Sequence, residues 1–540
     1  MRCVLLLFLS LVFLSDLVYP AVWMSSNSHD DIETTAFVSH DTPPDGDLSK
    51  IPSPLEGLKT TEATFNLDVS TDAERLDTVE EKHAPGGLPF ITMAARSIVS
   101  CLEQVATYAA RILMSDGLGD SWFRVFVFLF LFRYVRLVVH VVAYSRFKAK
   151  PVLARPAFTA QDVTVIIPTV EPRGAAFEEC LDRVLANSPA EIFIVTVGEE
   201  NIRTATSYCR ALSSSIRILS VAAPSKREQV KRAVQETTTA ITVLCDDTVF
   251  WPETFLPHVL APFEDPLVGI VGTCKRVRRA AGRFGLADFW NLCGVMRLER
   301  TNFDLAATNA VDGGVSCVSG RTCAVRSAIL QDPAFLHAYT HEYIFWLRTP
   351  LNAGDDKFLS RWVMRQGWRV FHQSCAEARI ETILGVKGGG QRFRGQCLRW
   401  ARSSARDNPK MLVADGLWRR YPWTAYAVLA TSLVNYAALY DPALVLALRA
   451  ALANPPTRAL LGDCDVLPLA VLCLWILATK FVRPASHYWR NPRDLVYAPF
   501  VILFGYYHSW IKLHALVTCW DISWGTRAGV DAAQKAPKAH

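Results

Sequence analysis

The sequence has few charged residues for its 540-residue length: Asp, Glu, Lys and Arg make up 20% of it, and hydrophobic residues make up 51%. This small charged share, with a mean hydropathy of +0.18, favours an integral membrane protein over a soluble enzyme. The net charge of +6 is also small. We therefore expect no nucleic-acid partner, because such an interface needs basic residues gathered on one face.

Paired cysteine motifs are absent as well. None of the 14 cysteines forms a CxxC pair, and those nearest the motifs described below are scattered along the chain. We expect these thiols, at Cys245, Cys317, Cys323 and Cys397, to be reduced and buried. This pattern is typical of a cytosolic domain and excludes a disulfide scaffold.

The first 150 residues divide into three predicted segments. Residues 1–24 contain a short apolar run that has two interpretations, a cleaved signal peptide or a first membrane anchor. Residues 25–87 are rich in Ser, Thr, Asp, Glu and Pro and have too little apolar surface to fold, so we expect disorder. Residues 88–150 are predicted to hold a helix at the membrane surface and then a transmembrane span.

The predicted span, Trp122–Tyr144, is long enough to cross a bilayer but contains two arginines. Arg133 and Arg136 must face a bundle interior or a polar cavity, because an arginine exposed to lipid is costly. The basic residues that follow, from Arg146 to Lys150, place the next domain on the cytosolic side.

Residues 151–420 are predicted to form an α/β domain. Four β-rich runs alternate with helical stretches such as 177–186 and 229–238. The predicted strands are Val163–Pro168, Ile192–Val197, Ile216–Val221 and Ile241–Asp247. This alternation predicts a parallel sheet that binds its ligand at the carboxyl ends of the strands.

Residues 421–520 are apolar again and predict further spans, followed by a cytosolic tail at 521–540. The candidate spans are Trp423–Ala453, Val466–Val482 and Leu495–Val517. The first is either one tilted helix or two passes broken at Asp441-Pro442. The basic loop at 483–493 favours a single pass, whereas a cytosolic tail requires an even number of spans, so the count stays open.

Acidic residues follow predicted strand ends or precede a predicted helix. Glu171 comes after the first strand, where a polar side chain can bind a nucleotide. Asp246 and Asp247 end the fourth strand, and adjacent carboxylates there can hold Mg²⁺ or Mn²⁺ against a diphosphate. Inverting sugar transfer needs a base for the acceptor hydroxyl, and Asp356, beside Asp355, is the candidate. The plain structural alternatives are a loop acid, a capping pair and a helix N-cap.

A fourth motif, Gln396-Cys397-Leu398-Arg399-Trp400, lies in a predicted helix. Gln396 and Trp400 share a helix face because they are one turn apart. Arg399 can bind a departing diphosphate, and Trp400 can stack on a sugar ring. The alternative is a basic amphipathic helix lying on the membrane.

Three acidic motifs followed in order by Q-x-x-R-W resemble the signature of processive family 2 glycosyltransferases, which include cellulose, chitin and hyaluronan synthases. The segments Cys245–Pro252, Ser319–Arg326 and Gly354–Trp362 most resemble the hyaluronan-synthase-like class, including the fungal type 2 glycosyltransferases associated with hyphal growth. The resemblance covers about residues 163–400 and the flanking apolar segments. It departs from the pattern at one place: a strict D-x-D is missing, which leaves the metal ligand open between Asp246 and Asp247, with Asp247 preferred.

The resemblance implies a GT-A, Rossmann-like α/β domain on the cytosolic side of an α-helical transmembrane bundle. It also implies a role for each matching residue. The nucleotide-binding group comprises Glu171, Lys226, Arg227, Asp246 and Arg399; the metal-binding pair is Asp246 and Asp247; the catalytic pair is Asp355 and Asp356; the acceptor group comprises Gln396, Trp400, Trp524 and Arg527. Trp524 and Arg527 belong to a W-G-T-R segment similar to one that chitin synthases bring near the nucleotide.

The activity that the resemblance implies is inverting transfer from a UDP-sugar to a growing polysaccharide, with Mg²⁺ or Mn²⁺ as cofactor. The product is expected to leave through the protein's own helices, and the location is the plasma membrane, in contact with its lipids. Two alternatives stand beside it: a non-processive, ceramide-type lipid glycosyltransferase, and a catalytically dead scaffold or transporter.

Overall fold

The computed structural model describes residues 121–209, 212–280, 284–344, 347–386, 388–461 and 465–522. All of these belong to one structural unit that covers residues 112–540. The predictions for residues 1–24, 25–87 and 88–120 lie outside the described residues, and so do those for Trp524 and Arg527.

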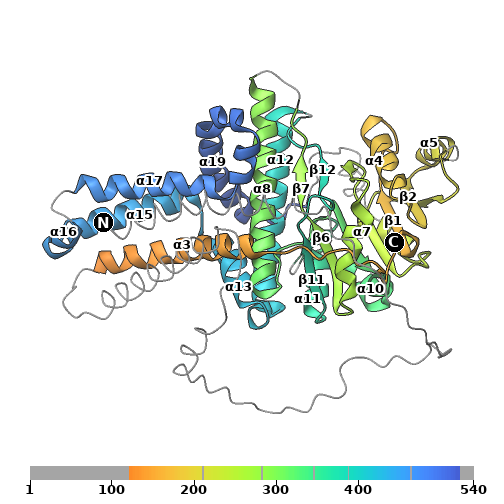
Figure 1. The fold of residues 1–540 in the computed structure, drawn as a ribbon, viewed down its shortest axis with the longest axis horizontal. Helices are drawn as coiled ribbons and strands as arrows, with labels where there is room; N and C mark the ends of the chain where they lie inside the picture. The colour runs from red at the N-terminus through yellow and green to blue at the C-terminus, as the bar shows by residue number, and fades with distance from the viewer. Residues whose placement is uncertain are drawn as a thin grey trace, which may run out of the picture. The chain divides into compact units, whose positions relative to one another are not determined.

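A seven-stranded sheet forms the centre of the α/β domain (Figure 1). Its strand order is β11-β6-β8-β4-β1-β2-β3. The strands are β1 (Val163–Pro168), β2 (Glu191–Val197), β3 (Ile216–Val221), β4 (Ile241–Cys245), β6 (Val268–Thr273), β8 (Thr322–Arg326) and β11 (Arg369–Gln373). The strand order places β1 and β4 side by side in the sheet, so their carboxyl ends meet at one edge.

The prediction of a parallel sheet needs one correction. Strands β1 to β4 are parallel to their neighbours, as the alternation of strand and helix predicts. Strand β8 instead runs antiparallel to both β4 and β6. It follows a long helix and a loop and is not part of a strand–helix–strand repeat with β4 or β6, so the right-handed crossover rule for parallel neighbours does not apply to it.

Alternating residues of the central strands fill a separate core on each face of the sheet. On β1, Ile166 packs in the cluster formed with Val230 and Leu359, whereas Val165 packs in the cluster formed with Phe177. This alternation is the two-residue period of a strand that is buried on both faces. The covering helices are α4 (Ala175–Leu185), α5 (Glu199–Cys209), α6 (Lys226–Val234), α7 (Phe255–Leu260), α9 (Ser327–Gln331), α10 (Pro333–Thr340) and α11 (Asp355–Arg365), with η1 (Ala160–Asp162) and η2 (Ala261–Glu264).

Two long helices, α8 (Leu286–Asp312) and α12 (Gly389–Pro409), lie between the sheet and the remaining helices (Figure 1). They contact each other, and α8 also packs against β11. The smaller sheets next to them are β5 (Val249–Phe250), β12 (Ile380–Thr382) and β7 (Lys275–Val277), and the pair β9 (Tyr343–Ile344) and β10 (Leu347–Pro350). Helix α12 carries the Q-x-x-R-W motif and contacts α19, so one element connects the sheet domain to the helix bundle.

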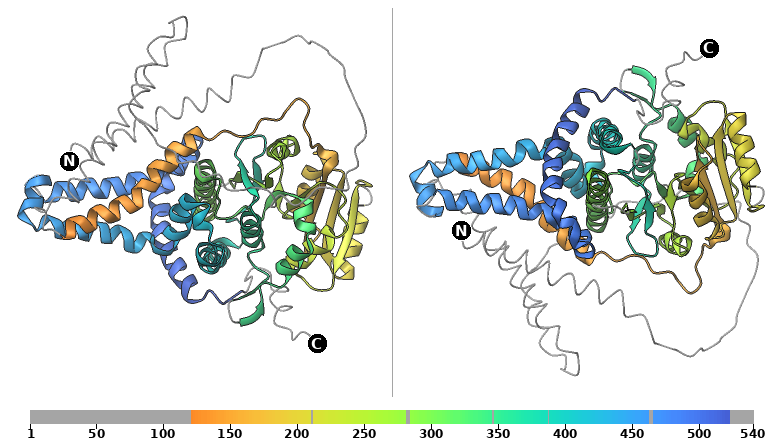
Figure 2. Two further views of the ribbon diagram at one scale, coloured as in Figure 1. Left: turned by 90° about the horizontal axis from the view of Figure 1, so that it is seen from below. Right: turned by 90° about the horizontal axis from the view of Figure 1, so that it is seen from above.

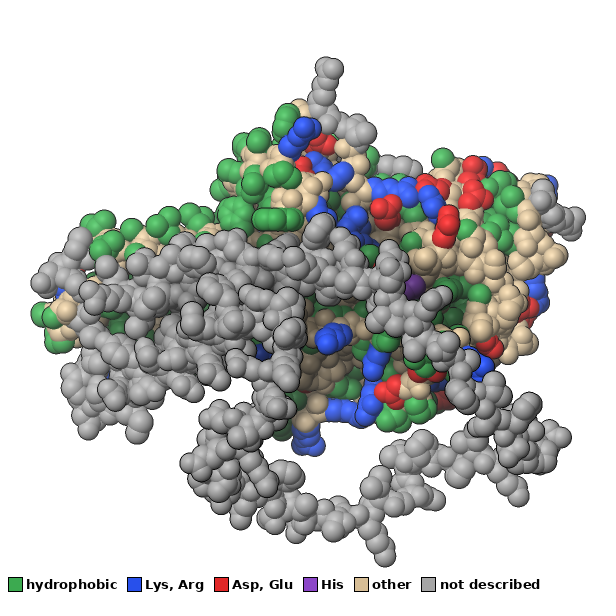
Figure 3. Space-filling model, in the orientation of Figure 1, with side chains coloured by type: hydrophobic (Ala, Val, Ile, Leu, Met, Phe, Trp, Pro, Cys, Tyr) green, Lys and Arg blue, Asp and Glu red, His purple; other side chains and the backbone are tan. Residues whose placement is uncertain are grey.

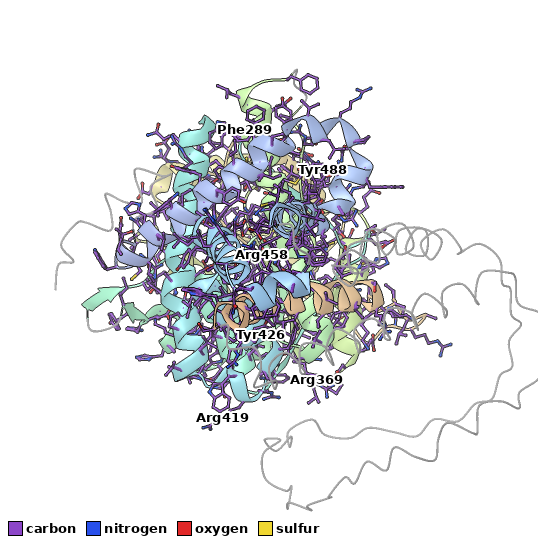
Figure 4. All side chains as sticks on the ribbon, turned by 90° about the vertical axis from the view of Figure 1, so that its left-hand side faces the viewer. Phe289, Arg369, Arg419, Tyr426, Arg458 and Tyr488 are labelled. Atoms are coloured by element: carbon purple, nitrogen blue, oxygen red, sulfur yellow. The ribbon has the colours of Figure 1, made fainter. Side chains whose placement is uncertain are left out.

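The apolar segments form a helix bundle in which α3, α15 and α17 run side by side (Figure 2). Its elements are α3 (Ser121–Arg146), α13 (Pro422–Thr424), α14 (Thr431–Val434), α15 (Ala437–Leu452), α16 (Pro455–Leu461), α17 (Val466–Val482), α18 (Ala485–Arg490) and α19 (Ala498–Val517), with η3 (Lys410–Ala414), η4 (Leu417–Arg419), η5 (Ala425–Ala430) and η6 (Pro492–Tyr497). Tyr426 lies against α3 (Figure 4), and its hydroxyl donates to the carbonyl of Phe132.

Among the described helices, α3 is long and apolar enough to cross a membrane. The pair Pro422–Val434 and Ala437–Leu452 adds a second candidate if it counts as one broken span, and α17 is apolar but shorter. Hydrophobic side chains cover the visible part of α17, whereas acidic and basic ones gather over the α/β domain (Figure 3). The span expected at 495–517 corresponds to α19, which does not reach the same apolar threshold.

Of the two alternatives for residues 423–453, the one with a break at Asp441-Pro442 does not match the structure, where the break lies earlier. The chain bends by 89° between Val434 and Ala437, and Asp441 and Pro442 continue inside α15. Tyr436, in an extended conformation, precedes the new helix as its N-cap residue. Pro442 is the sixth residue of α15, so the hydrogen bond that an N–H there would donate to the carbonyl of Ala438 is missing, yet the helix continues through it.

Candidate active site

Acidic residues from two neighbouring strands meet at the carboxyl edge of the sheet. Asp246 and Asp247 follow β4, and Glu171 lies just past the end of β1. Thr169 joins the two strand ends, since its Oγ1 donates to Asp247 Oδ2 at 2.9 Å and accepts from the amide of Glu171 at 3.1 Å. The expected juxtaposition of these two motifs is therefore present.

Lys226 connects the second acidic motif to the third. Its Nζ lies 2.7 Å from Asp246 Oδ1 and 3.1 Å from Asp355 Oδ2, and it donates to the carbonyl of Gly320 at 3.0 Å. Lys226 stands at the start of α6, and Ser225 caps that helix by accepting from the amide of Glu228. One ammonium thus holds together carboxylates that are more than one hundred positions apart in sequence.

The electrostatics of this group stabilise its charged forms. Burial alone would lower the pKa of Lys226, but Asp246 and Asp355 outweigh burial and raise it well above its ordinary value. Burial likewise works to raise the pKa of Asp355, yet the positive charges of Lys226 and Arg227 bring it below the usual range. Asp355 is therefore a carboxylate at neutral pH and serves as a partner for cations.

Asp356 lies against the loop that leads into β8. Its Oδ2 accepts from the amide of Gly320 at 3.3 Å, and its Oδ1 accepts from the amide of Lys357 at 2.9 Å. Ser360 bonds the backbone of Asp356 at 2.7 Å and accepts from the amide of Val318 at 2.8 Å. The carboxylate is thus held at the first turn of α11 by the segment that precedes β8.

The Q-x-x-R-W helix reaches the same loop. The guanidinium of Arg321 lies 5.7 Å from the centre of the Trp400 ring, and that of Arg297 lies 4.6 Å from it. Arg321 directly follows Gly320, whose amide bonds Asp356. Asp356 and Trp400 therefore border one site.

The comparisons with known proteins identify the family. The model of a family described as "Glycosyltransferase like family 2" matches residues 160–403. A type 2 glycosyltransferase of Gibberella zeae is 37% identical over 435 residues, which cover 79% of this chain and 80% of that protein. The chain belongs to the family 2 glycosyltransferases.

One further curated relative and one solved structure show similarity to this family 2 glycosyltransferase. An NDP-glycosyltransferase of Aspergillus luteorubrus is 32% identical over 295 residues, 52% of this chain and 70% of that one. A mannosyltransferase from Pyrobaculum calidifontis, solved with GDP-mannose and Mn²⁺, has 17% identity and a TM-score of 0.41, covering 68% of this chain and 99% of its own. Family membership and the sheet order together confirm a GT-A-type α/β glycosyltransferase domain that uses a nucleotide-sugar donor.

Arg227 occupies a different place from the one expected. Sequence reasoning groups it with Lys226 as a diphosphate contact, but in this glycosyltransferase it is only 1% exposed. Its guanidinium lies 2.8 Å from Glu342 Oε2 and donates to the carbonyl of Tyr339 at 2.6 Å. It forms a buried ion pair with Glu342 and not a contact at the open edge of the sheet.

Three basic residues that border the site have no role in the sequence analysis: Arg321, Lys275 and Arg297. Arg321 lies in Ser319–Arg326, one of the segments that carry the family resemblance. Its place at the site depends on β8 running antiparallel to its neighbours, which the sequence analysis did not predict. Burial, with a contribution from Arg321, lowers the pKa of Lys275 to about 8. Lys275 lies on β7, a short strand outside the main sheet that no sequence pattern singles out.

The Asp pair of the glycosyltransferase fits a divalent cation that is shared with a diphosphate. Within the described residues, no three His, Cys, Asp or Glu side chains converge as a protein-only metal site. Mg²⁺ typically takes one or two carboxylates and completes its shell with water and substrate phosphates. Thr169 and Lys226 orient Asp247 and Asp246 through one oxygen each, and these oxygen donors suit Mg²⁺ or Mn²⁺.

A cavity of about 420 Å³, lined by seven Lys or Arg side chains, lies between Trp400 and the helix bundle. Trp400 lines it on the α12 side, and Arg133 and Arg136 of α3 line it on the bundle side. A neighbouring cavity of about 200 Å³ shares Arg297 and Arg300 with it. The expectation that both α3 arginines face a polar interior is thus met by the geometry of the glycosyltransferase.

Proposed function

We propose that the protein is a membrane polysaccharide synthase that transfers sugar from a UDP-sugar to a growing glycan with inversion. The observation that carries this proposal is the cavity that joins Trp400 of the transfer site to Arg133 and Arg136 of α3, a helix long and apolar enough to cross a membrane. An enzyme that releases its product to water has no need for such a passage. An enzyme that passes its product into a membrane does.

The donor would be held at the carboxyl edge of the sheet. Glu171, exposed beside β1, is suited to the nucleoside, and Lys226 and Arg399 are the cations available for the diphosphate. Bound Mg²⁺ or Mn²⁺ would neutralise the diphosphate as it leaves. Asp246 and Asp247 are the residues that would hold the ion, with Asp247 preferred.

The acceptor would lie between α11 and α12. Asp356 takes the proton from the acceptor hydroxyl as that oxygen attacks the anomeric carbon, because its carboxylate borders the site and is fixed by Gly320. Trp400 stacks on the terminal sugar, and Gln396, one turn earlier on α12, hydrogen bonds to it. Trp524 and Arg527 are proposed to complete the acceptor site.

The helices around the cavity are proposed to lie in the plasma membrane, in contact with its lipids, with the α/β domain in the cytosol. The apolar character of α3 and the basic residues that follow it support this orientation. Cell-wall or matrix synthesis during hyphal growth is the role we propose for such a product, since the sequence resembles fungal enzymes with that association.

The experiment is an assay of the purified full chain with a panel of UDP-sugars and Mg²⁺ or Mn²⁺, followed by sizing of the products. We expect a long polymer from wild type and a loss of at least about a hundredfold in rate for Asp356→Asn, in line with a missing general base. UDP binding should survive in that variant. A single-sugar lipid as the product would overturn processive synthesis, and full turnover by Asp356→Asn would remove the base assignment.

A further inference from the structure

The cavity beside Trp400 is strongly cationic. Of its described lining residues, seven are Lys or Arg and one, Asp304, is acidic. Three of the cations have carboxylate partners: Arg133 and Lys480 share Asp441, and Arg483 pairs with Asp304. The remaining four are Arg136, Arg297, Arg300 and Lys512.

None of these four has a described Asp or Glu within ion-pair distance. Arg136 donates to the carbonyl of Ala427 at 2.9 Å and to Thr431 Oγ1 at 2.8 Å, and its Nε is buried without a described partner. Among the described residues, Lys512 Nζ lies over the Tyr436 ring and donates at 3.5 Å to the carbonyl of Asn435. Such cations, turned toward one cavity and away from water, repel each other unless an anion joins them.

The second cavity gives the ligand an apolar portion. It shares Arg297, Arg300 and Asp304 with the first cavity, so the two adjoin. The rest of its lining is largely apolar, namely Cys293, Met296, Phe393, Cys397, Val501 and Phe504. A charged chamber beside an apolar one is suited to an amphipathic ligand.

The size of the cationic cavity decides which anion fits best. A volume of about 420 Å³ holds a lipid head group, or only a few sugars of a passing glycan at one time. An acidic glycan brings at most one carboxylate per sugar, so few negative charges would enter. A phosphate or diphosphate ester concentrates its charge in a small volume and forms paired hydrogen bonds with guanidinium groups.

We propose that this pair of cavities binds a lipid phosphate, with the phosphate among Arg136, Arg297, Arg300 and Lys512 and the lipid chain beside Val501. Placed next to Trp400, the lipid phosphate is the acceptor of the first sugar: one of its phosphate oxygens bonds to the anomeric carbon, the bond from that carbon to the donor's diphosphate breaks, and UDP leaves. The proposal rests on the membrane location given under the proposed function. It goes beyond that function because it specifies the chemical class of the acceptor.

The test uses the full chain in nanodiscs of neutral phosphatidylcholine and measures binding without any donor, so its outcome does not depend on transfer activity. The probes are a long-chain isoprenyl phosphate and the corresponding alcohol. We expect the phosphate to bind at least tenfold more tightly than the alcohol. Equal binding of the two would overturn the proposal, and this comparison needs only wild-type protein.

Variants assign the site. Arg136→Gln with Lys512→Gln should weaken binding of the isoprenyl phosphate at least tenfold, whereas Arg449→Gln should leave it unchanged, since Arg449 is an exposed bundle arginine outside the cavity. Val501→Phe should weaken binding of the long-chain phosphate but not of a short-chain one. An equal loss in Arg449→Gln would contradict the assignment.

Competition separates the possible sources of the anion. Inorganic phosphate or an acidic oligosaccharide that displaces the lipid at equal concentration would overturn the lipid assignment in favour of a soluble anion. If binding is as expected and products are nevertheless not polymeric, the inference stands while processive synthesis fails. If polymer forms but the isoprenyl phosphate binds no more tightly than the alcohol, processive synthesis stands and the lipid-phosphate inference fails.

Discussion

At the scale of single residues, the Asp pair after β4 contains two different carboxylates. Asp247 is 7% exposed and accepts from Thr169, whereas Asp246 is paired with Lys226. We predict that Asp247→Asn weakens UDP binding about tenfold or more in the presence of Mn²⁺ and little in its absence, because a charged metal ligand is lost. Calorimetric titration of UDP with and without Mn²⁺ measures this.

Two other aspartates provide comparisons for this prediction: Asp246, next to Asp247, and Asp182 on α4. Asp182→Asn, an exposed position on α4, should bind UDP like wild type. If Asp246→Asn removes the metal dependence while Asp247→Asn keeps it, the preferred ligand is Asp246.

The lowered pKa of Lys275 leads to a separate prediction about how stability depends on pH. Its pKa in the folded protein is about 8, lowered by burial and by Arg321, against about 10.4 in an unfolded chain. The unfolded chain therefore binds more protons, and stability rises with pH between these two values. Burial of the charged lysine lowers the free energy of unfolding by about 3 kcal/mol. This cost is fully present below about pH 8 and disappears toward about pH 10.

Thermal unfolding between pH 7 and pH 10 tests this dependence. The thermal unfolding midpoint of wild type should rise relative to that of Lys275→Met as the pH increases. Lys231→Met, at a half-exposed surface lysine of α6, should instead follow wild type. Parallel curves for wild type and Lys275→Met would mean that Lys275 titrates normally.

At the scale of elements, the segment before β8 positions the proposed base on α11. A Cβ added to Gly320 would lie 3.0 Å from the Asp356 Cβ and 3.3 Å from its Oδ2. Gly320→Ala should therefore displace that carboxylate and reduce kcat by roughly ten- to a hundredfold, because small errors in position are costly for a catalytic group. UDP affinity should stay within about twofold.

Gly395→Ala is the matched control for Gly320→Ala. It adds the same methyl group to α12, where nothing lies within 4 Å of the added atom. We expect unchanged kcat and slightly higher stability, since alanine favours the helix. If Gly320→Ala keeps full kcat, Asp356 either moves without consequence or is not the base.

The same scale shows what sequence can and cannot predict. β1 and β3 have the predicted bounds because apolar, β-branched runs end there at clear boundaries. Lys226 and Arg227 could not both face the donor, because successive helix residues point about 100° apart, and only Lys226 does so. The placement of Arg321 depends on β8, whose antiparallel insertion is a property of the whole sheet and leaves no local pattern in the sequence.

At the scale of the whole molecule, Asp441 joins four helices of the bundle. Its carboxylate pairs with Arg133 of α3, accepts from Lys480 of α17 at 2.7 Å and accepts from Tyr506 of α19 at 2.8 Å. Sequence reasoning gave Asp441-Pro442 as the place of a break if the segment makes two passes. The structure shows instead that this acidic residue is the point where α15 binds its neighbours.

The last prediction follows from that position. Asp441→Asn removes the negative charge but leaves Arg133 and Lys480 buried, and breaking a buried pair from one side costs about 3 to 5 kcal/mol. Asp465→Asn breaks a pair with Arg458 whose side chains are 50% and 44% exposed, and an exposed pair is worth less than about 1 kcal/mol. Thermal midpoints of both variants in the same detergent should therefore differ strongly, with Asp441→Asn far lower. Equal midpoints would mean that the bundle does not depend on this carboxylate. They would also argue against the polar interior that the proposed passage between α3, α15, α17 and α19 requires.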